Sequence, residues 1–421
     1  MPPDSTATRR VIAASTVGNA LEWYDFAIYG LMAPILGKLF FPADDAVASL
    51  LAAFGVFALG YAVRPIGGLV LGHIGDRFGR KRTLILSVGL MGVTTCAIGL
   101  LPDHASIGTA APALLIVLRL LQGLSVGGEF PGSMVFLGEH APPGRRGFFV
   151  AWTQVGCLTG FLLGSGTGAL AATVFGEAAM ADWGWRLPFL LGAPIALVGY
   201  IFRRRLAEPP AARTLSRAEG LPIVVAVRDH WRAIARITAI SVGGTVGFYL
   251  AFIYAASYLT QQMHVSTAKA LDIESAALLL MLAMAVPAGV LSDRVGRKPV
   301  MIASCLAMIL FAWPLWWLIH RDATLAILAG QLGFAFIMGV IVTAATAAFV
   351  EMVPAKVRFS GVALGYNAAI GLIGGATPLV VTFLVERTAD DFTPAYVLIA
   401  AALVQLAALL GLKETAGKPL A

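Results

Sequence analysis

Two carboxylates, Glu22 and Asp25, lie inside an apolar stretch that runs from about residue 11 to about residue 41. An ionised carboxylate at the centre of a membrane-spanning helix costs about 2.5–3.5 kcal/mol on insertion scales, so an acid in this place indicates a functional role. At about 100° per residue, the two acids share one helix face. The same face also carries Asn19, Phe26 and Tyr29. We therefore expect one side of this helix to be polar and to face protein or water rather than lipid.

A second apolar stretch, at 110–138, carries a matching polar stripe. On a continuous helix its members fall within about a third of the circumference. They are Arg119, Gln122, Ser125, Glu129 and Ser133. Because lipid would leave polar groups unsatisfied, two such faces must look at each other or at water. We expect them to line a central cavity.

Asp25 and Arg119 are the pair from which we expect proton exchange. A carboxyl group in a cavity that loses its water favours the neutral form. An adjacent guanidinium instead favours the ionised carboxylate. A conformational change that moves Asp25 between these two settings would load and release a proton. The alternatives are a permanent structural ion pair between the two helices, or a proton carried by Glu22 or Glu129.

Arg64 lies within another apolar stretch, directly before Pro65, whose missing N–H loosens the helix. Arginine is the side chain best suited to bind a carboxylate through two parallel hydrogen bonds. It could bind a substrate carboxylate, or pair internally with Glu22 or Glu129. The other candidate substrate-binding residues are Asn19, Tyr29, Gln122, Gln154, Tyr249, Tyr254, Tyr258, Tyr366 and Asn367. Trp23, Tyr24, Tyr29 and Trp152 could form a cation–π surface for a quaternary ammonium group.

The elements that must position these side chains are membrane helices. Hydrophobic residues make up 58% of the 421 residues and charged residues only 13%, against about a quarter in soluble domains. Twelve apolar segments approach or exceed the ~20 residues needed to cross the hydrocarbon. They lie at about 11–41, 46–72, 83–101, 110–138, 147–175, 184–202, 233–262, 274–292, 299–319, 324–350, 359–386 and 392–412.

The basic residues predict the orientation of these segments. Short cytoplasmic loops are enriched in Lys and Arg, and most of the 30 basic residues fall in alternate connections if the N-terminus is inside. Both termini are then cytoplasmic. This asymmetry accounts for the net charge of +7, so no nucleic-acid partner is needed.

The chain also repeats itself. The sequence GHIGDRFGRK at 72–81 returns as GVLSDRVGRK at 289–298. Glu139, Pro142 and Arg146 return as Glu351, Pro354 and Arg358. Internal duplication is a recurrent plan of secondary transporters. We predict two six-helix bundles, at 1–206 and 233–421, joined by a cytoplasmic linker at 207–232.

The repeated charges predict a latch between helix ends. Carboxylate–guanidinium pairs form directional, charge-assisted bonds. We expect Glu139 to pair with Arg146, and Glu351 with Arg358. The full set of candidate gate residues is Asp76, Arg77, Arg80, Glu139, Arg146, Glu208, Asp293, Arg294, Arg297, Glu351 and Arg358. The alternative is that they are ordinary surface charges, each worth little.

The two GxxxDRxGRK loops, the RLLQG sequence at 119–123 and the Glu…Arg pairs resemble the signature loops of the major facilitator superfamily. Within it, the sequences GNALEWYDFAIYG (18–30), RPIGG (64–68), QGLSVGGE (122–129) and DWGWR (182–186) resemble the metabolite:proton symporters. That family transports citrate, 2-oxoglutarate, shikimate, proline and betaine. The resemblance implies an all-α fold of twelve helices in two pseudo-symmetric bundles. It also implies that Asp25 and Arg119 correspond to the proton-binding pair of proton-coupled sugar porters, and Glu208 to a gate glutamate.

Sugar is disfavoured as the substrate. Gln154 matches a sugar-contacting Gln of the sugar porters, but their Gln/Asn cluster on the seventh helix is replaced here by small and aromatic residues at 243–249. The chain ends at Ala421 without the long coiled-coil tail of some osmosensing members, which favours an organic acid.

We therefore expect a monomeric, multi-pass protein of the bacterial inner membrane. Its expected function is proton-coupled uptake of a di- or tricarboxylate by alternating access, with a zwitterionic osmolyte such as proline or betaine as the alternative substrate. A drug carrier or a passive channel is less expected. No GxxxxGK[ST] loop and no set of His and Cys residues at metal-ligand spacing is found, so we expect no enzyme activity, no metal and no cofactor beyond the coupling proton.

Overall fold

The computed structural model describes residues 5–68, 80–204 and 222–420, and every regular element in these ranges is helical. The first half of the chain contains α1 (Ser5–Leu31), α2 (Ala33–Phe40), α3 (Ala46–Ala62), α5 (Arg80–Leu100), α6 (His104–Ile107), α7 (Ala110–Ser125), α8 (Glu129–His140), α9 (Arg146–Ala179), the π-helix η1 (Met180–Gly184) and α10 (Arg186–Arg204). The second half contains α12 (Pro222–Tyr249), the π-helix η2 (Leu250–Tyr254), α13 (Ala255–Gln261), α14 (Thr267–Val295), α15 (Arg297–Ile319), α16 (Thr324–Glu351), the short 3₁₀ turn η3 (Ala355–Val357), α17 (Arg358–Ala368), the π-helix η4 (Ala369–Gly374), α18 (Thr377–Thr388) and α19 (Thr393–Leu410).

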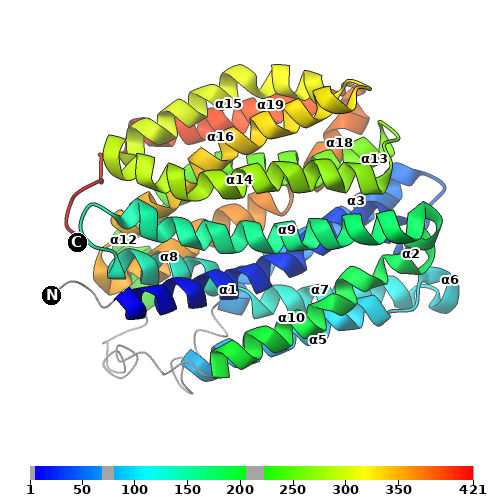
Figure 1. Ribbon diagram of the computed structural model, residues 1–421, viewed down its shortest axis with the longest axis horizontal. Coiled ribbons are helices and arrows are strands. Elements are labelled where there is room, and N and C mark those ends of the chain that lie inside the picture. Colours follow the sequence, from blue (N-terminus) through cyan, green and yellow to red (C-terminus); the bar gives the residue numbers. More distant parts are fainter. Residues whose placement is uncertain (1–4, 69–79, 205–221, 421) are drawn as a thin grey trace.

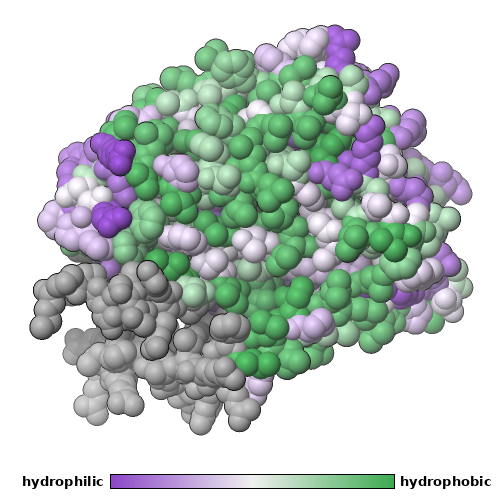
Figure 2. Space-filling model, in the orientation of Figure 1, coloured by the Kyte–Doolittle hydropathy of each residue, from purple (hydrophilic) through white to green (hydrophobic). Residues whose placement is uncertain are grey.

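The composition of these helices fits a membrane. Within the described ranges, nine helical stretches are long and apolar enough to cross a bilayer. Large apolar side chains such as Val93, Leu310 and Leu325 are exposed on the outside of the molecule. Figure 2 shows hydrophobic residues across the middle of one face and hydrophilic residues gathered at its two ends. An outer surface of this kind matches lipid rather than water.

The long helices run side by side along the molecule (Figure 1). α1 begins and α19 ends at the left of that view, which we call the terminal end. α2, α6, α13 and α18 lie towards the right, which we call the opposite end.

The two halves meet along a seam formed by α9 and α14, which pack along much of their length (Figure 1). Near the terminal end, a Cβ on Gly147 would lie 2.3 Å from the carbonyl oxygen of Gly289, so only glycine permits this approach. Towards the opposite end, Ser165 Oγ donates to the carbonyl of Leu271 (3.1 Å) and lies 2.8 Å from Ser275 Oγ.

Several expected single helices are interrupted. The 110–138 stretch breaks where Val126 adopts an extended conformation, which separates α7 from α8. A Cβ on Gly127 would lie 2.4 Å from the backbone nitrogen of Gly68, so close packing of backbones fixes this break. The prediction of one polar stripe on a continuous helix was therefore wrong, because Glu129 belongs to a separate helix from Arg119.

Candidate functional site

The polar face of α1 is buried and contacts other helices of the first half. Asn19, Glu22 and Asp25 are each at most 2% exposed. Asn19 Nδ2 donates to Ser133 Oγ on α8 at 2.8 Å. This face therefore looks at protein rather than at lipid or at a wide water-filled space.

Asp25 is held by two neutral hydrogen-bond donors. One carboxylate oxygen accepts from Thr95 Oγ1 on α5. The other accepts from Gln122 Nε2 on α7 at 2.9 Å. The amide oxygen of Gln122 in turn accepts from Arg119 Nη1 at 2.9 Å. Gln122 thus links the acid to the base.

The direct ion pair expected between Asp25 and Arg119 is not found in the part of the chain that the structure describes. The guanidinium of Arg119 instead lies over the rings of Tyr29 (4.2 Å to the centroid) and Phe26 (5.0 Å). Its Nε and Nη2 atoms have no hydrogen-bond partner. Aromatic faces stabilise a desolvated cation and so hold Arg119 one side chain away from the acid.

Arg64 is fully buried and pairs with Glu22, with Nη2 2.5 Å from Oε1. Its guanidinium lies within 5.4 Å of the ring centroids of Trp23, Phe26 and Tyr61. Nε and Nη1 have no partner, so part of its donor capacity is unused. The structure therefore shows the internal pair, and leaves donors that a ligand could also use.

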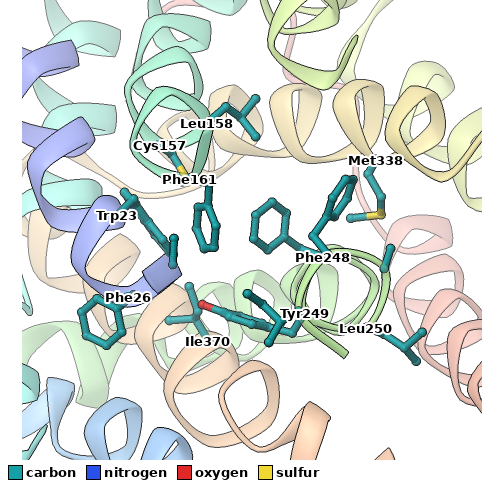
Figure 3. Close-up of a cluster of buried hydrophobic side chains, with 14 of the residues drawn as sticks. Trp23, Phe26, Cys157, Leu158, Phe161, Phe248, Tyr249, Leu250, Met338 and Ile370 are labelled. Atoms are coloured by element: carbon teal, nitrogen blue, oxygen red, sulfur yellow. The ribbon is translucent and has the colours of Figure 1, made fainter. Parts of the chain in front are cut away.

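A cavity of about 50 Å³ lies between the two halves. The first half contributes Trp23, Phe130, Gln154 and Cys157 to its wall. The second half contributes, among others, Ser241, Thr245, Phe248, Tyr249, Tyr366 and Gln405. Figure 3 shows Trp23, Phe161, Phe248 and Tyr249 pointing towards one another across this region. A water needs about 10–15 Å³, so a cavity of this volume holds a few water molecules at most.

Of the candidate substrate-binding residues, Gln154, Tyr249 and Tyr366 line this cavity. The others lie elsewhere. Tyr29 donates to the carbonyl of Ala53 at 3.2 Å, and Tyr254 stacks on Trp316. The remaining members that do not line the cavity are Asn19, Arg64, Gln122, Tyr258 and Asn367.

Asn367 has a structural contact instead. Its Nδ2 donates at 2.8 Å to the carbonyl oxygen of Gly127, inside the break between α7 and α8. This bond satisfies an acceptor that the interrupted helix cannot use itself. It also ties the second half to the helix that carries Arg119 and Gln122.

Asp293 joins the two halves at the terminal end. Its carboxylate accepts from the backbone N–H groups of Gly147 (2.8 Å) and Phe148 (2.9 Å), in the first turn of α9. Arg297 Nη2 donates to the same carboxylate at 2.7 Å. The first turn of a helix has free N–H groups and a partial positive charge, so it is a favourable place for an acid.

The other gate charges pair between the halves. Arg358 Nη1 lies 2.7 Å from Glu139 Oε1, and Arg146 Nη1 lies 3.3 Å from Glu351 Oε1. Both expected pairs, Glu139 with Arg146 and Glu351 with Arg358, were therefore wrong, because the repeated motifs face each other across the seam. Arg294 is exposed and forms no ion pair among the described residues. The expected gate residues Asp76, Arg77 and Glu208, and the side chain of Arg80, lie outside the described residues.

The segment after α19 covers this end. Glu414 accepts from the backbone N–H groups of Arg297 and Lys298, both at 3.0 Å. Burial raises the pKa of this carboxyl, but the backbone donors, Ala416 N–H among them, outweigh burial and hold the pKa below its usual value. Arg146 of the first half donates to the carbonyl of Lys418 at 2.7 Å.

The opposite end is bridged as well. Glu177, at the end of α9, accepts from the backbone N–H of Thr267 (2.5 Å) and from its hydroxyl (2.8 Å) in the first turn of α14. The halves therefore contact each other at both ends, and the cavity lies between these contacts.

Residues 16–378 and 273–416 match the Major Facilitator Superfamily. The chain belongs to this superfamily. It is an all-helical, multi-pass membrane protein of the superfamily fold.

Its relatives are bacterial transporters. It is 36% identical over 429 residues to the glycine betaine/proline/ectoine/pipecolic acid transporter OusA of Dickeya dadantii, covering 99% of this chain and 85% of OusA. It is 35% identical to the proline/betaine transporter of Escherichia coli K12 (99% and 86% covered) and 34% identical to the citrate-proton symporter of Salmonella typhi (93% and 91%). The solved proton:xylose symporter XylE shares the fold, with a TM-score of 0.81 at 18% identity over 99% of this chain and 98% of XylE.

Three residues of this site were missed by the sequence reasoning. Thr95 binds Asp25, and Ser241 and Gln405 line the cavity. Hydroxyls in membrane helices usually bond their own backbone, so residue type alone gave no signal for Thr95 or Ser241. Gln405 was open to prediction, since an amide within an apolar segment needs a partner.

Proposed function

We propose that the protein is a proton-coupled symporter that takes up a small solute bearing a carboxylate group by alternating access. It works as a monomer in a bacterial inner membrane, with the proton as its coupling ion and with no enzyme activity and no cofactor. Twelve spans form two bundles, 1–206 and 233–421, joined by a linker at 207–232, with both termini in the cytoplasm. The terminal end is then the cytoplasmic end.

The observation that carries the proposed coupling is the setting of Asp25. It is 2% exposed, on a helix that the proposed topology places across the membrane, and is bonded to two neutral donors rather than to a cation. Burial of this kind favours the protonated carboxyl, whereas an approaching guanidinium favours the ionised form. Arg119 is bonded to the side-chain amide of Gln122, which in turn is bonded to Asp25. Two nitrogens of the Arg119 guanidinium group have no hydrogen-bond partner. A small shift of α7 against α1 would exchange Gln122 for Arg119 and release the proton.

The cavity favours a zwitterion such as glycine betaine or proline as the solute. Its wall combines the aromatic residues Trp23, Phe248, Tyr249 and Tyr366 with no charged side chain among the described lining residues. Aromatic faces bind quaternary ammonium groups through cation–π attraction. Relatives named for betaine and proline cover 99% of the chain, which supports the same class.

An organic acid is the second candidate. Arg64 has two nitrogens without a partner and lies over the ring of Trp23, which lines the cavity. A shift of this side chain towards the cavity would supply the donors that a carboxylate needs. The citrate-proton symporter among the relatives supports this reading.

The alternating gate follows from the paired contacts at each end. Opening to the cytoplasm requires that Asp293 leave the first turn of α9 and that the Glu139–Arg358 and Glu351–Arg146 pairs separate. Opening to the outside requires that Glu177 leave the first turn of α14.

Purified protein in a thermal-shift screen tests the substrate class. We expect stabilisation by glycine betaine or proline and not by shikimate, whereas stabilisation by citrate or 2-oxoglutarate alone would favour the second candidate. In liposomes, we expect saturable uptake, uphill accumulation driven by a pH gradient, and counterflow. Passive flux that ignores the pH gradient would contradict a symporter and indicate a channel.

A further inference from the structure

Glu274 is a buried acid in the second half, far in sequence from Asp25. It lies on α14 and is 1% exposed. Neither oxygen of its carboxyl group has a hydrogen-bond partner. An ionised carboxylate buried without a partner is among the most costly groups in a protein. Its charge must therefore be removed or compensated.

Gln331, on α16, is a second buried polar group without a partner. It is fully buried, and neither its amide oxygen nor its amide nitrogen is bonded. An unsatisfied amide inside a membrane protein also costs free energy. The second half of the chain therefore contains two buried polar side chains, Glu274 and Gln331, that lack hydrogen-bond partners.

The packing of α14 on α16 places these two residues at one level. The short connections to α15 at both ends make α14 and α16 run in the same direction. A Cβ on Gly339 of α16 would contact Met281 and Met284 of α14. Eight residues before Gly339 is Gln331, and seven residues before Met281 is Glu274. Seven residues are about two helical turns, so Glu274 shares with Met281 the face that meets α16.

No charged side chain compensates Glu274 among the described residues. The charged or titratable groups on the packed elements are Arg146, Cys157 and Glu177 on α9, Tyr258 on α13, Arg297, Lys298 and Cys305 on α15, Glu351 on α16, and Lys269, Asp272, Asp293 and Arg294 on α14 itself. Glu177, Lys269 and Asp272 are exposed at the opposite end, and Arg146, Asp293, Arg294, Arg297, Lys298 and Glu351 belong to helix ends at the terminal end. Tyr258 is bonded to His320. None forms an ion pair or hydrogen bond with Glu274.

We propose that Glu274 is a second proton-binding site, in which Glu274 is the carboxylic acid and Gln331, which is not bonded to it in this conformation, becomes its amide partner when the two side chains turn towards each other. A protonated carboxyl has one O–H donor and one carbonyl acceptor, which match the acceptor and the donors of an amide. The site is separate from Asp25, since it lies in the other half of the chain. The proton removes the charge that no side chain compensates.

The site lies beside the seam between the halves. Ser275, the next residue, contacts Ser165 of α9 at 2.8 Å. Separation of the halves at the opposite end brings water to within about one helical turn of Glu274. The proton can then exchange with the outside solution in that conformation and is shielded when the halves are in contact there.

Infrared difference spectroscopy of the full-length protein in lipid vesicles at neutral pH tests the site. We expect Glu274→Gln to lose the carbonyl stretching band of one protonated carboxyl group. The matched control, Asp272→Asn, removes an exposed acid two residues away on the same helix and should keep that band. Gln331→Leu should keep the band but shift its frequency, because the hydrogen-bond partner is lost. An unchanged spectrum in Glu274→Gln would overturn the proposal.

One further outcome is decisive. Thermal stabilisation of the wild type by Na⁺ that disappears in Glu274→Gln would show a metal-cation site and overturn the proton assignment. The infrared band does not depend on the proposed proton coupling, so failure of this site and failure of the proposed function are distinguishable.

Discussion

Asp293→Asn should open the terminal end of the transporter. The carboxylate accepts two backbone N–H groups from the first turn of α9, at 2.8 and 2.9 Å. Hydrogen bonds to a charged group contribute about 1.5–3 kcal/mol and neutral ones about 0.5–1.5 kcal/mol, so loss of the charge costs about 1 kcal/mol for each bond. Two bonds give about 2 kcal/mol, which is about a 30-fold shift away from the closed terminal end.

Spin labels on Pro143 and Lys413 measure this shift. Both positions are exposed, and they lie in different halves of the chain. In a cysteine-free background, double electron–electron resonance should show a longer-distance population that grows in Asp293→Asn. The matched control is Arg294→Gln, which removes an exposed neighbouring charge and should leave the distances unchanged. Equal distance distributions in the wild type and Asp293→Asn would refute a gate role for this carboxylate.

Two more predictions concern the interior. Arg64→Lys should raise the half-saturation concentration for uptake, because an ammonium group cannot reproduce the planar fork; an unaltered value would leave Arg64 as an internal ion-pair partner only. Gly127→Ala should lower the thermal stability by about 1–3 kcal/mol through overpacking, since its Cβ would lie 2.4 Å from Gly68 N. Gly166→Ala, whose Cβ meets nothing within 4 Å, is the control and should melt like the wild type. Equal melting of both alanine variants would show that the segment at Gly127 can move away from Gly68 without cost and would contradict close packing as the cause of the break.

The sequence predicted what depends on local pattern. Apolar length predicted membrane helices, and the 3.6-residue period put Glu22 and Asp25 on one buried face of α1. The duplicated motifs predicted that Asp293 and Glu351 lie at a charged interface. These features follow from residue type and spacing along a single element.

What the sequence did not predict depends on contacts between elements. Gln122 stands between Asp25 and Arg119, because aromatic rings hold the guanidinium aside. Glu139 pairs with Arg358 of the other half, and no local spacing encodes that exchange.

The break at Gly127 arises from the approach of Gly68, 59 residues earlier in the chain. Glu274 gave only a weak sequence signal, because it stands at the edge of its apolar segment, two residues after Asp272.

Asp25→Asn tests proton coupling most directly. The variant mimics the protonated carboxyl permanently and keeps a side chain that can bond Gln122. In proteoliposomes it should abolish accumulation driven by a pH gradient but spare solute binding and much of the counterflow, since exchange does not require the proton to leave. Glu22→Gln and Glu129→Gln, measured beside it, remove other acids of the site. If Asp25→Asn still accumulates solute uphill while one of these glutamine variants cannot, the coupling proton is carried by that glutamate and not by Asp25.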